Sequence, residues 1–296
     1  KIKIGVIQIV EHPALDAARE GFIKALADKG YQEGTEVVYD YQNAQGDMST
    51  AQTIAKQFSY DDLDLILAIA TPTAQAVSNS IKDTPILITA VTDPKSAGLV
   101  DSLDQPGGNL TGTSDLTPVR EQFKLLKKID EDIKRVGILY NAGETNSVFQ
   151  VKLARKVAKD LNLELVEATV SSSNEVYQSA QSLVGRVDGI YVPTDNTVVS
   201  AIQSVVKVAE KNDLPLISGE SKSVESGALA TVGINYNKLG YQTGEMAVKI
   251  LQGADPGKMP IGYLNNADLV INLKAATNMR VEIPQKIIDK AKRVIK

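Results

Sequence analysis

The sequence contains one pattern twice, and this internal repeat limits the possible folds more than any other feature. Lys3-Ile4-Gly5-Val6-Ile7 returns as Arg135-Val136-Gly137-Ile138-Leu139, and the apolar segment 63–73 matches 187–197 in the same order. The repeat is far longer than the periods of solenoids or propellers. The chain of 296 residues also fits two domains of roughly 100 to 200 residues each. The sequence therefore predicts two copies of a whole domain.

Short apolar runs predict strands that are buried on both faces, which is typical of parallel sheets. These runs are 4–9, 63–70, 86–91, 136–140 and 188–192. Between them lie amphipathic helices, of which 13–29 ends at Gly30 and 148–161 is the equivalent in the second half. The predicted fold class is α/β, with two similar doubly wound parallel-sheet lobes.

The pattern of the first lobe ends around residues 111–118, where a new helix, 119–129, opens the second lobe. We place further crossovers near 235 and near 270. The N-terminal lobe is then 1–115 plus about 236–270. The C-terminal lobe is 116–235 plus about 271–296, and a multi-strand hinge joins the two.

Composition excludes several classes of protein. The chain has a net charge of −4 and no basic stripe, so we expect no nucleic-acid partner. No apolar run approaches the length of about 18 residues that a membrane-spanning helix needs. The absence of cysteine and the single histidine leave no metal-ligand cluster, and we expect neither a metal nor a cofactor.

The first strand begins directly after Lys1, with no charged start, apolar segment or cleavage site before it. We expect either a cytosolic protein or a mature domain whose leader has been removed.

Signatures of common enzymes are missing. There is no Gly-x-Ser-x-Gly elbow and no Walker loop, and the glycine-rich segment 106–109 precedes a strand as a turn. We expect a protein that is not an enzyme, although scattered carboxylates leave acid–base catalysis open at this level.

Ligands of doubly wound sheets bind beyond the carboxyl ends of the strands. Six loops occupy that position: 8–13, 71–73 and 92–94 in the first lobe, and 140–147, 194–197 and 218–221 in the second. These loops contain the candidate binding residues.

Thr71 and Asp195 occupy equivalent places in the two lobes. Thr71 precedes Pro72, which predicts a threonine N-cap at a helix whose free N–H groups favour a carboxylate or phosphate. Asp195 is either another helix cap or the partner of an ammonium group. The pair suggests a zwitterionic ligand with its carboxylate at Thr71 and its ammonium at Asp195. The alternative is two well-capped helices and nothing more.

Other loop residues have two interpretations each. His12, between Glu11 and Pro13, either contacts ligand or is a partly exposed loop residue before a helix. Asp93 starts a turn before Pro94 or contacts ligand. Glu220, after Gly219, contacts ligand or is solvated.

The second-lobe loop 140–147 is polar. Asn141 is a candidate for a hydrogen bond to the ligand, whereas Ser147 is expected to cap the following helix.

At these loops the chain resembles the substrate-binding proteins of ATP-binding-cassette transporters, of the tryptophan and aromatic amino-acid type. The matching stretches, which cover essentially the whole chain, are 11–16, 43–47, 70–75, 90–94, 106–109, 140–147, 191–197 and 239–244.

The resemblance implies a periplasmic-binding-protein fold of the first type, ligand capture by hinge closure and delivery to a membrane permease. It implies an extracytoplasmic protein, either periplasmic or a cell-surface lipoprotein whose acylated cysteine lies upstream. Relatives often carry an aspartate where this chain has Asn235, which favours Asp195 as the ammonium partner.

The expected ligand is an amino acid, L-tryptophan or L-phenylalanine before others. Because the chain has no tryptophan, an aromatic slot would use Tyr140, Tyr191 or the apolar residues of the first loop. We expect a monomer. The predicted ligand-binding residues are Glu11, His12, Pro13, Thr71, Thr73, Thr92, Asp93, Tyr140, Asn141, Asp195, Asn196, Gly219, Glu220 and Asn235.

Two alternatives remain. The first is a receptor for a different small solute, such as a branched amino acid, a sugar or a nucleoside. The second is the effector-sensing domain of a transcriptional regulator, which would carry a helix-turn-helix before the first strand.

Overall fold

A computed structural model describes residues 1–296, which form two compact units. Unit 1 comprises Lys1–Leu116 and Tyr236–Asn265, and unit 2 comprises Thr117–Asn235 and Asn266–Lys296. The sequence placed the first two breaks at 115/116 and 235/236 and the third near 270, about five residues beyond the break in the structure. No helix of the protein is both long and apolar enough to cross a membrane.

Unit 1 is built on a six-stranded sheet in the order β11-β5-β4-β3-β1-β2, in which every neighbouring pair is parallel. Its strands are β1 (Ile2–Gln8), β2 (Val37–Asn43), β3 (Leu65–Ile69), β4 (Ile86–Val91), β5 (Leu110–Ser114) and β11 (Gly262–Tyr263). Every residue of β3, β4 and β5 is buried. This confirms the parallel sheet that the continuous apolar runs predicted.

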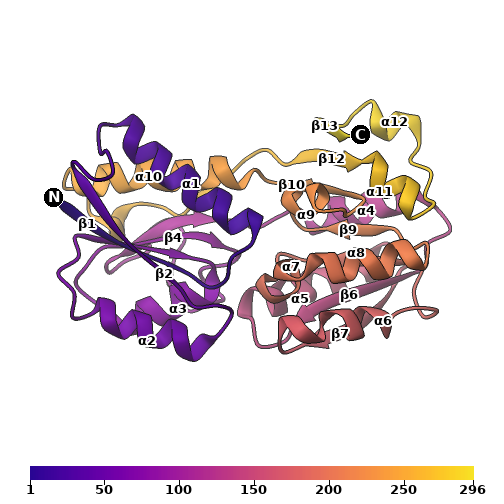
Figure 1. The fold of residues 1–296 in the computed structure, drawn as a ribbon, viewed down its shortest axis with the longest axis horizontal. Coiled ribbons are helices and arrows are strands. Elements are labelled where there is room, and N and C mark those ends of the chain that lie inside the picture. The colour runs from indigo at the N-terminus through magenta and orange to yellow at the C-terminus, as the bar shows by residue number, and fades with distance from the viewer. The chain divides into compact units, whose positions relative to one another are not determined.

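Helices cover both faces of this sheet, with α1 (Pro13–Asp28) and α10 (Tyr236–Leu251) side by side, although they are over 200 residues apart in sequence. Figure 1 shows this pair on one side of the strands, with α2 (Met48–Phe58) and α3 (Thr71–Ser80) on the other. The chain continues from α10 through the short 3-10 helix Pro256–Lys258.

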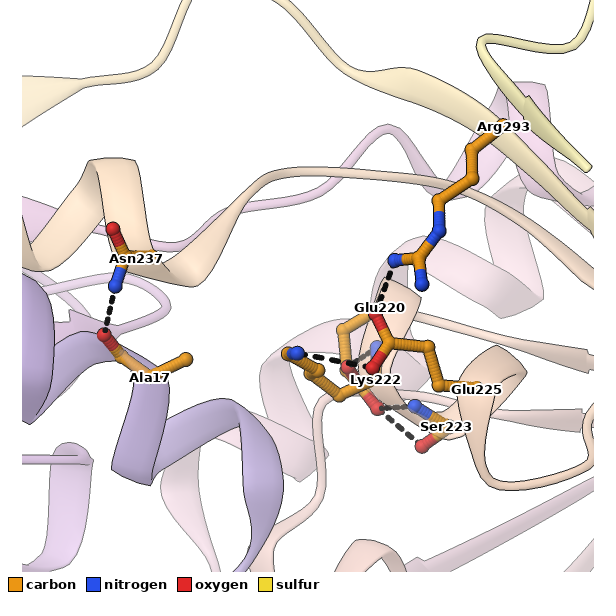
Figure 2. A network of polar contacts seen from close by, with 7 residues as sticks. All are labelled: Ala17, Glu220, Lys222, Ser223, Glu225, Asn237 and Arg293. Carbon is orange, nitrogen blue, oxygen red and sulfur yellow. Dashed lines mark hydrogen bonds and ion pairs between the residues drawn. The ribbon is translucent and has the colours of Figure 1, made fainter. Parts of the chain in front are cut away.

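Glycines bring α1 and α10 into close contact. A Cβ on Gly240 would overlap the carbonyl oxygen of Ala18, and one on Gly21 would overlap the carbonyl oxygen of Asn237. The Asn237 amide donates to the carbonyl of Ala17 at 3.4 Å (Figure 2). The two helix backbones approach so closely because these positions have no side chain.

Unit 2 is built on a seven-stranded sheet in the order β13-β12-β10-β9-β8-β6-β7. Its strands are β6 (Arg135–Asn141), β7 (Glu164–Val170), β8 (Gly189–Val192), β9 (Leu216–Ser218), β10 (Ala230–Gly233), β12 (Asp268–Asn272) and β13 (Arg293–Ile295). All neighbouring pairs are parallel except β10 with β12. The antiparallel strand is the first that forms after the chain returns to unit 2.

The helices of unit 2 include two that the sequence predicted, α4 (Val119–Ile129) and α5 (Thr145–Asp160). The others are α6 (Val176–Gln181), α7 (Asn196–Ser200), α8 (Ile202–Lys211), α9 (Ser221–Glu225), α11 (Leu273–Asn278), α12 (Gln285–Ile288) and the 3-10 helix Ser173–Glu175. Helix α5 begins three residues before the predicted position 148. The expectation that Ser147 caps it is wrong, because Ser147 lies within its first turn and Glu144 occupies the N-cap position.

The repeat found in the sequence has a structural counterpart in each sheet. Strand β1 lies between β3 and β2 in unit 1, and β6 lies between β8 and β7 in unit 2. Gly5 and Gly137 are the equivalent residues of the repeated segment in these two strands. A Cβ would lie 2.8 Å from Leu63 in the first case and 2.8 Å from Leu183 in the second. The repeated glycine therefore leaves room for a leucine that packs directly over the strand.

Candidate functional site

Three polar residues follow three adjoining strands at one edge of unit 1. Thr71 follows β3, Thr92 follows β4 and Asp115 follows β5, and β4 pairs with both of the other strands. All three side chains are buried. The sequence predicted the first two as binding residues and missed Asp115.

Thr71 is the first residue of α3, and its N-cap is Ala70. The prediction of a threonine N-cap is wrong, because the carbonyl of Ala70 already accepts the first helical hydrogen bond, from the N–H of Ala74 at 3.1 Å. Thr71 is instead 1% exposed, and its buried hydroxyl has no hydrogen-bond partner. A buried polar atom without a partner is costly, and this hydroxyl therefore has a hydrogen bond left to make.

The backbone before this helix is strained. Ala70 has φ 84° and ψ 157°, a region that essentially only glycine occupies freely. Ala90 has φ 56° at an irregularity in the pairing of β4 with β5, just before Thr92. Strained residues cluster where the surrounding structure holds them for a function, and these two lie beside the two threonines.

Thr73 has a different environment from Thr71. Its hydroxyl donates to the carbonyls of Ile69 and Ala70, at 2.6 and 2.9 Å. The hydroxyl thereby holds the strained turn in place, and only its backbone N–H, in the first turn of α3, remains for an anion.

Thr92, Asp115 and Tyr236 form a buried cluster. The Asp115 carboxylate accepts hydrogen bonds from the Thr92 hydroxyl at 2.9 Å and from the Tyr236 hydroxyl at 2.6 Å. Burial raises the pKa of Asp115 above its ordinary value, because no basic side chain pairs with it.

The remaining first-lobe candidates have local structural roles or lie on the surface. His12 caps α1, and its Nδ1 accepts from the N–H of Leu15 at 3.5 Å. It is only 7% exposed, so the interpretation of His12 as a partly exposed loop residue is wrong. Asp93 starts a turn, as one interpretation predicted, and accepts from the N–H of Ser96 at 2.9 Å. Glu11 and Pro13 are exposed.

In unit 2, Asp195 is fully buried and caps α7. Its carboxylate accepts from the N–H of Val198 at 2.7 Å, the N–H of Asn141 at 2.6 Å and the Ser147 hydroxyl at 2.6 Å. Burial and the neighbouring charge of Glu144 raise the pKa of Asp195 to about 7. This geometry supports the interpretation of Asp195 as a helix cap.

Glu144 is a second buried carboxylate of the same cluster. It accepts hydrogen bonds from the backbone N–H groups of Asn196 and Thr197 at 3.1 and 3.0 Å, and from their side chains at 2.6 and 2.7 Å. It therefore joins the loop after β6 to the start of α7. Asn196, a predicted ligand residue, uses its amide for this contact.

Glu220 caps α9 and is 1% exposed, so the expectation that it is solvated is wrong. Its carboxylate accepts from the N–H groups of Lys222 and Ser223 and from the Ser223 hydroxyl (Figure 2). Beside it, Glu225 forms ion pairs with Lys222 and Arg293. Burial raises the pKa of Glu220 despite these hydrogen bonds.

Gly219, which precedes Glu220, lies close to the backbone of the loop that contains Thr194. A Cβ at this position would lie 2.9 Å from the backbone nitrogen of Thr194, and its carbonyl accepts from the Gln122 amide at 3.2 Å. Glycine is needed here because two loops of the same edge meet.

Tyr140 and Tyr191 were both predicted to form an aromatic slot, and for Tyr191 this prediction is wrong. Tyr191 is 1% exposed and packs edge-on against Phe123, with ring centres 5.0 Å apart, while its hydroxyl donates to Gln122. It is a core residue and has no surface for a ligand. Tyr140 is 7% exposed and donates to Glu167 at 2.8 Å.

Asn141 is half-buried, whereas Asn235 is exposed. The Asn141 amide donates to the Thr197 hydroxyl at 2.9 Å, and its oxygen accepts from the N–H of Gly143 at 2.8 Å. Asn235 is exposed and lines a cavity of about 280 Å³ with Ser221 and Asp268.

Among the polar residues that the sequence did not single out, Asp115, Glu144 and Gln122 are all buried. The sequence pattern that could have indicated them is a charged or amide residue next to the end of a predicted strand or at the start of a predicted helix. No group of three or more histidine or acidic residues is arranged to hold a metal ion.

Comparison with known proteins identifies the family. A family model described as ABC transporter substrate binding protein matches residues 3–295. The chain is 51% identical, over 91% of its length and 78% of the other chain, to a protein named tyrosine-binding protein from Clostridioides difficile. Among solved structures, a domain from Streptococcus pneumoniae in complex with L-Trp is 37% identical, with full coverage of both chains and a TM-score of 0.96. A conserved domain protein from Vibrio cholerae is 41% identical over 99% of both chains, with a TM-score of 0.97.

The chain belongs to the ABC transporter substrate-binding protein family. Its two α/β units have the type I periplasmic-binding-protein fold, which more distant solute-binding proteins of solved structure share. The resemblance found in the sequence is confirmed at the level of family and fold.

Proposed function

We propose that this protein captures an aromatic amino acid outside the cytoplasmic membrane and delivers it to the permease of an ABC importer. The names of two relatives support this choice of ligand, one being called tyrosine-binding and the other having been crystallised with L-Trp. The protein binds and releases its ligand without converting it. It acts as a monomer, either free in the periplasm or as a lipoprotein.

The observation that carries this proposal is the start of α3. The N–H groups of its first turn, the positive end of the helix dipole and the unpartnered Thr71 hydroxyl all belong to this one turn. Such an arrangement suits a carboxylate, because each donor gains a charge-assisted hydrogen bond. An α-amino acid carries that group, whereas a neutral sugar does not.

The predicted binding residues remain a proposal. Thr71, Thr73 and Thr92 have the strongest support, since they lie at adjoining strand ends of unit 1. The hypothesis that Asp195 receives the ammonium is less well supported, because three of its roughly four acceptor positions are used by its own chain.

The test is a binding screen of the twenty amino acids by thermal shift, followed by calorimetry with tyrosine, tryptophan and phenylalanine. A ligand at 100 times its Kd should add about 2.7 kcal/mol of stability. We expect an aromatic amino acid to give the largest shift and to be recovered unchanged. Larger shifts with leucine, with a sugar or with a nucleoside would replace this proposal with the corresponding solute.

A further inference from the structure

We propose that Asp115 receives the α-ammonium group of the captured amino acid, while Thr71 binds its carboxylate. This inference rests on the proposed function and deepens it. Both charged groups of the ligand would then be bound by one edge of unit 1.

The placement of Asp115 is fixed by the pairing of β4 with β5. The N–H of Asp115 donates to the carbonyl of Val91 at 3.2 Å, and the Ser114 hydroxyl donates to the carbonyl of Thr92 at 2.8 Å. Asp115 is thus beside Thr92, and Thr92 follows the strand next to that of Thr71. Neighbouring strands lie about 4.8 Å apart, so the three residues line a short stretch of one edge.

The charge of Asp115 is not balanced within the protein. Asp115 is 3% exposed, and the two side chains that donate to its carboxylate are the neutral hydroxyls of Thr92 and Tyr236. Buried carboxylates are ordinarily paired with a cation, and a carboxylate has about four acceptor positions. Asp115 therefore has acceptor capacity left for a positively charged donor.

The chemistry of an α-amino acid matches this arrangement. Its carboxylate and ammonium are attached to one carbon, so a receptor must present an anion site and an acceptor side by side. The start of α3 provides the first, and Asp115 on the same edge provides the second. The Thr92 hydroxyl donates to Asp115 at 2.9 Å and so helps to hold its carboxylate in place.

The buried carboxylates of unit 2 have other roles. Asp195 caps α7 and Glu220 caps α9, each with backbone N–H groups on its oxygens. Asp115 caps no helix, because α4 begins four residues later, at Val119, with Pro118 as its N-cap. The helix-capping role that explains the other two does not explain Asp115.

The experiment compares an aromatic amino acid with its analogue that lacks the amine. The pairs are L-tyrosine with 3-(4-hydroxyphenyl)propanoate and L-tryptophan with indole-3-propanoate, and calorimetry gives the ratio of their affinities. In Asp115→Asn we expect this ratio to fall about 30-fold or more, because the ammonium loses its charged partner. Affinity for the analogue should change little.

Asp188→Asn is the control, because Asp188 pairs with Arg135 and is not among the predicted binding residues, and it should keep the ratio of the wild type. The inference is overturned if Asp115→Asn leaves the ratio unchanged, or if Asp195→Asn abolishes it instead. A purely structural role for Asp115 would weaken both ligands of a pair equally, which also overturns it.

Thr92→Val provides a second readout if Asp115→Asn does not fold. It keeps the shape of the side chain and removes the hydroxyl that donates to Asp115, and we expect the ratio to fall about tenfold because the carboxylate is no longer held in place. An unchanged ratio in this variant would contradict the inference. Failure of the wild type to bind any aromatic amino acid would instead refute the proposed function itself.

Discussion

Glu144 binds Thr197 twice, through the backbone N–H at 3.0 Å and the hydroxyl at 2.7 Å, both on the same carboxylate oxygen. The other oxygen accepts from Asn196 and from the Asn146 amide. Two loops of unit 2 that are about fifty residues apart in sequence are therefore held together by one side chain.

Replacing Glu144 by glutamine should destabilise the protein by about 2 kcal/mol. An amide has one acceptor oxygen, so donors that face its NH₂ group are left without a partner, at about 1–3 kcal/mol for each group. Chemical denaturation at pH 7 measures this loss. Glu121→Gln, at an exposed surface pair with Lys124, should change stability by less than about 0.5 kcal/mol. Equal effects in the two variants would contradict the role of Glu144.

Stability should depend on pH through Asp195, whose pKa is about 7 in the folded protein against 3.8 ordinarily. Between these values the folded state binds a proton that the unfolded state has lost. Stability from this group is therefore lost as pH rises from about 4 to 7, by up to about 1.4 kcal/mol per pH unit. Asp195→Asn removes this contribution. The free energy of unfolding of the variant, measured against that of the wild type, should therefore increase between pH 5 and 7.5.

Asp188→Asn provides the control for this pH dependence. The Arg135 guanidinium holds the pKa of Asp188 below its ordinary value, so its contribution is lost only as pH falls in the acid range. Unfolding free energies of this variant and the wild type should differ by a constant amount from pH 5 to 7.5. If the difference in unfolding free energy from the wild type changed with pH equally in Asp195→Asn and Asp188→Asn, the assignment of the pH dependence to Asp195 would be refuted.

Thr71→Val should weaken ligand binding about tenfold and raise the stability of the ligand-free protein by about 1 kcal/mol. The first effect follows from the loss of a donor to the carboxylate, and the second from removal of a buried hydroxyl that has no partner. Thr73→Val is the contrasting change, because its hydroxyl bonds to two carbonyls and its loss should lower stability. Calorimetry and thermal unfolding measure the two properties, and a fall in stability in both variants would contradict the environment described for Thr71.

Gly240→Ala should destabilise the protein by about 1–3 kcal/mol or more. The new methyl group would overlap the backbone of Ala18, so α1 and α10 would have to separate. Glu245→Ala, at an exposed position of the same helix, should change stability by no more than about 0.5 kcal/mol. If Gly240→Ala proved as mild as this control, the close packing of the two helices would be wrong.

The sequence predicted the two-lobed fold because duplication and apolar runs are visible along the chain. Strand ends such as those before Thr71 and Thr92 followed from the same runs, and so did the loops that hold them. Asp115 could not be found in this way, because its partner Tyr236 is 121 residues away. Glu144 was missed for the same reason, since its bonds to Asn196 span 52 residues. Side-chain partners at such separations depend on packing, which hydrophobic periodicity does not describe.

The two capping predictions failed for a physical reason that concerns the backbone. Thr71 has the residue type of an N-cap, but the unusual conformation of Ala70 starts the helix one residue earlier. Ser147 likewise has a capping residue type, but its hydroxyl donates to Asp195. Residue preference indicates that a helix begins nearby and does not determine which residue ends up in the cap.

The conformation of Ala70 limits which amino acids evolution or design can place there. The N–H of Ala70 is tied to Thr89 and its carbonyl receives both Ala74 and Thr73, so the turn cannot relax without breaking several hydrogen bonds. A branched or bulky side chain would meet both an unfavourable backbone and a filled interior. Libraries that randomise position 70 should accordingly return glycine, alanine and little else.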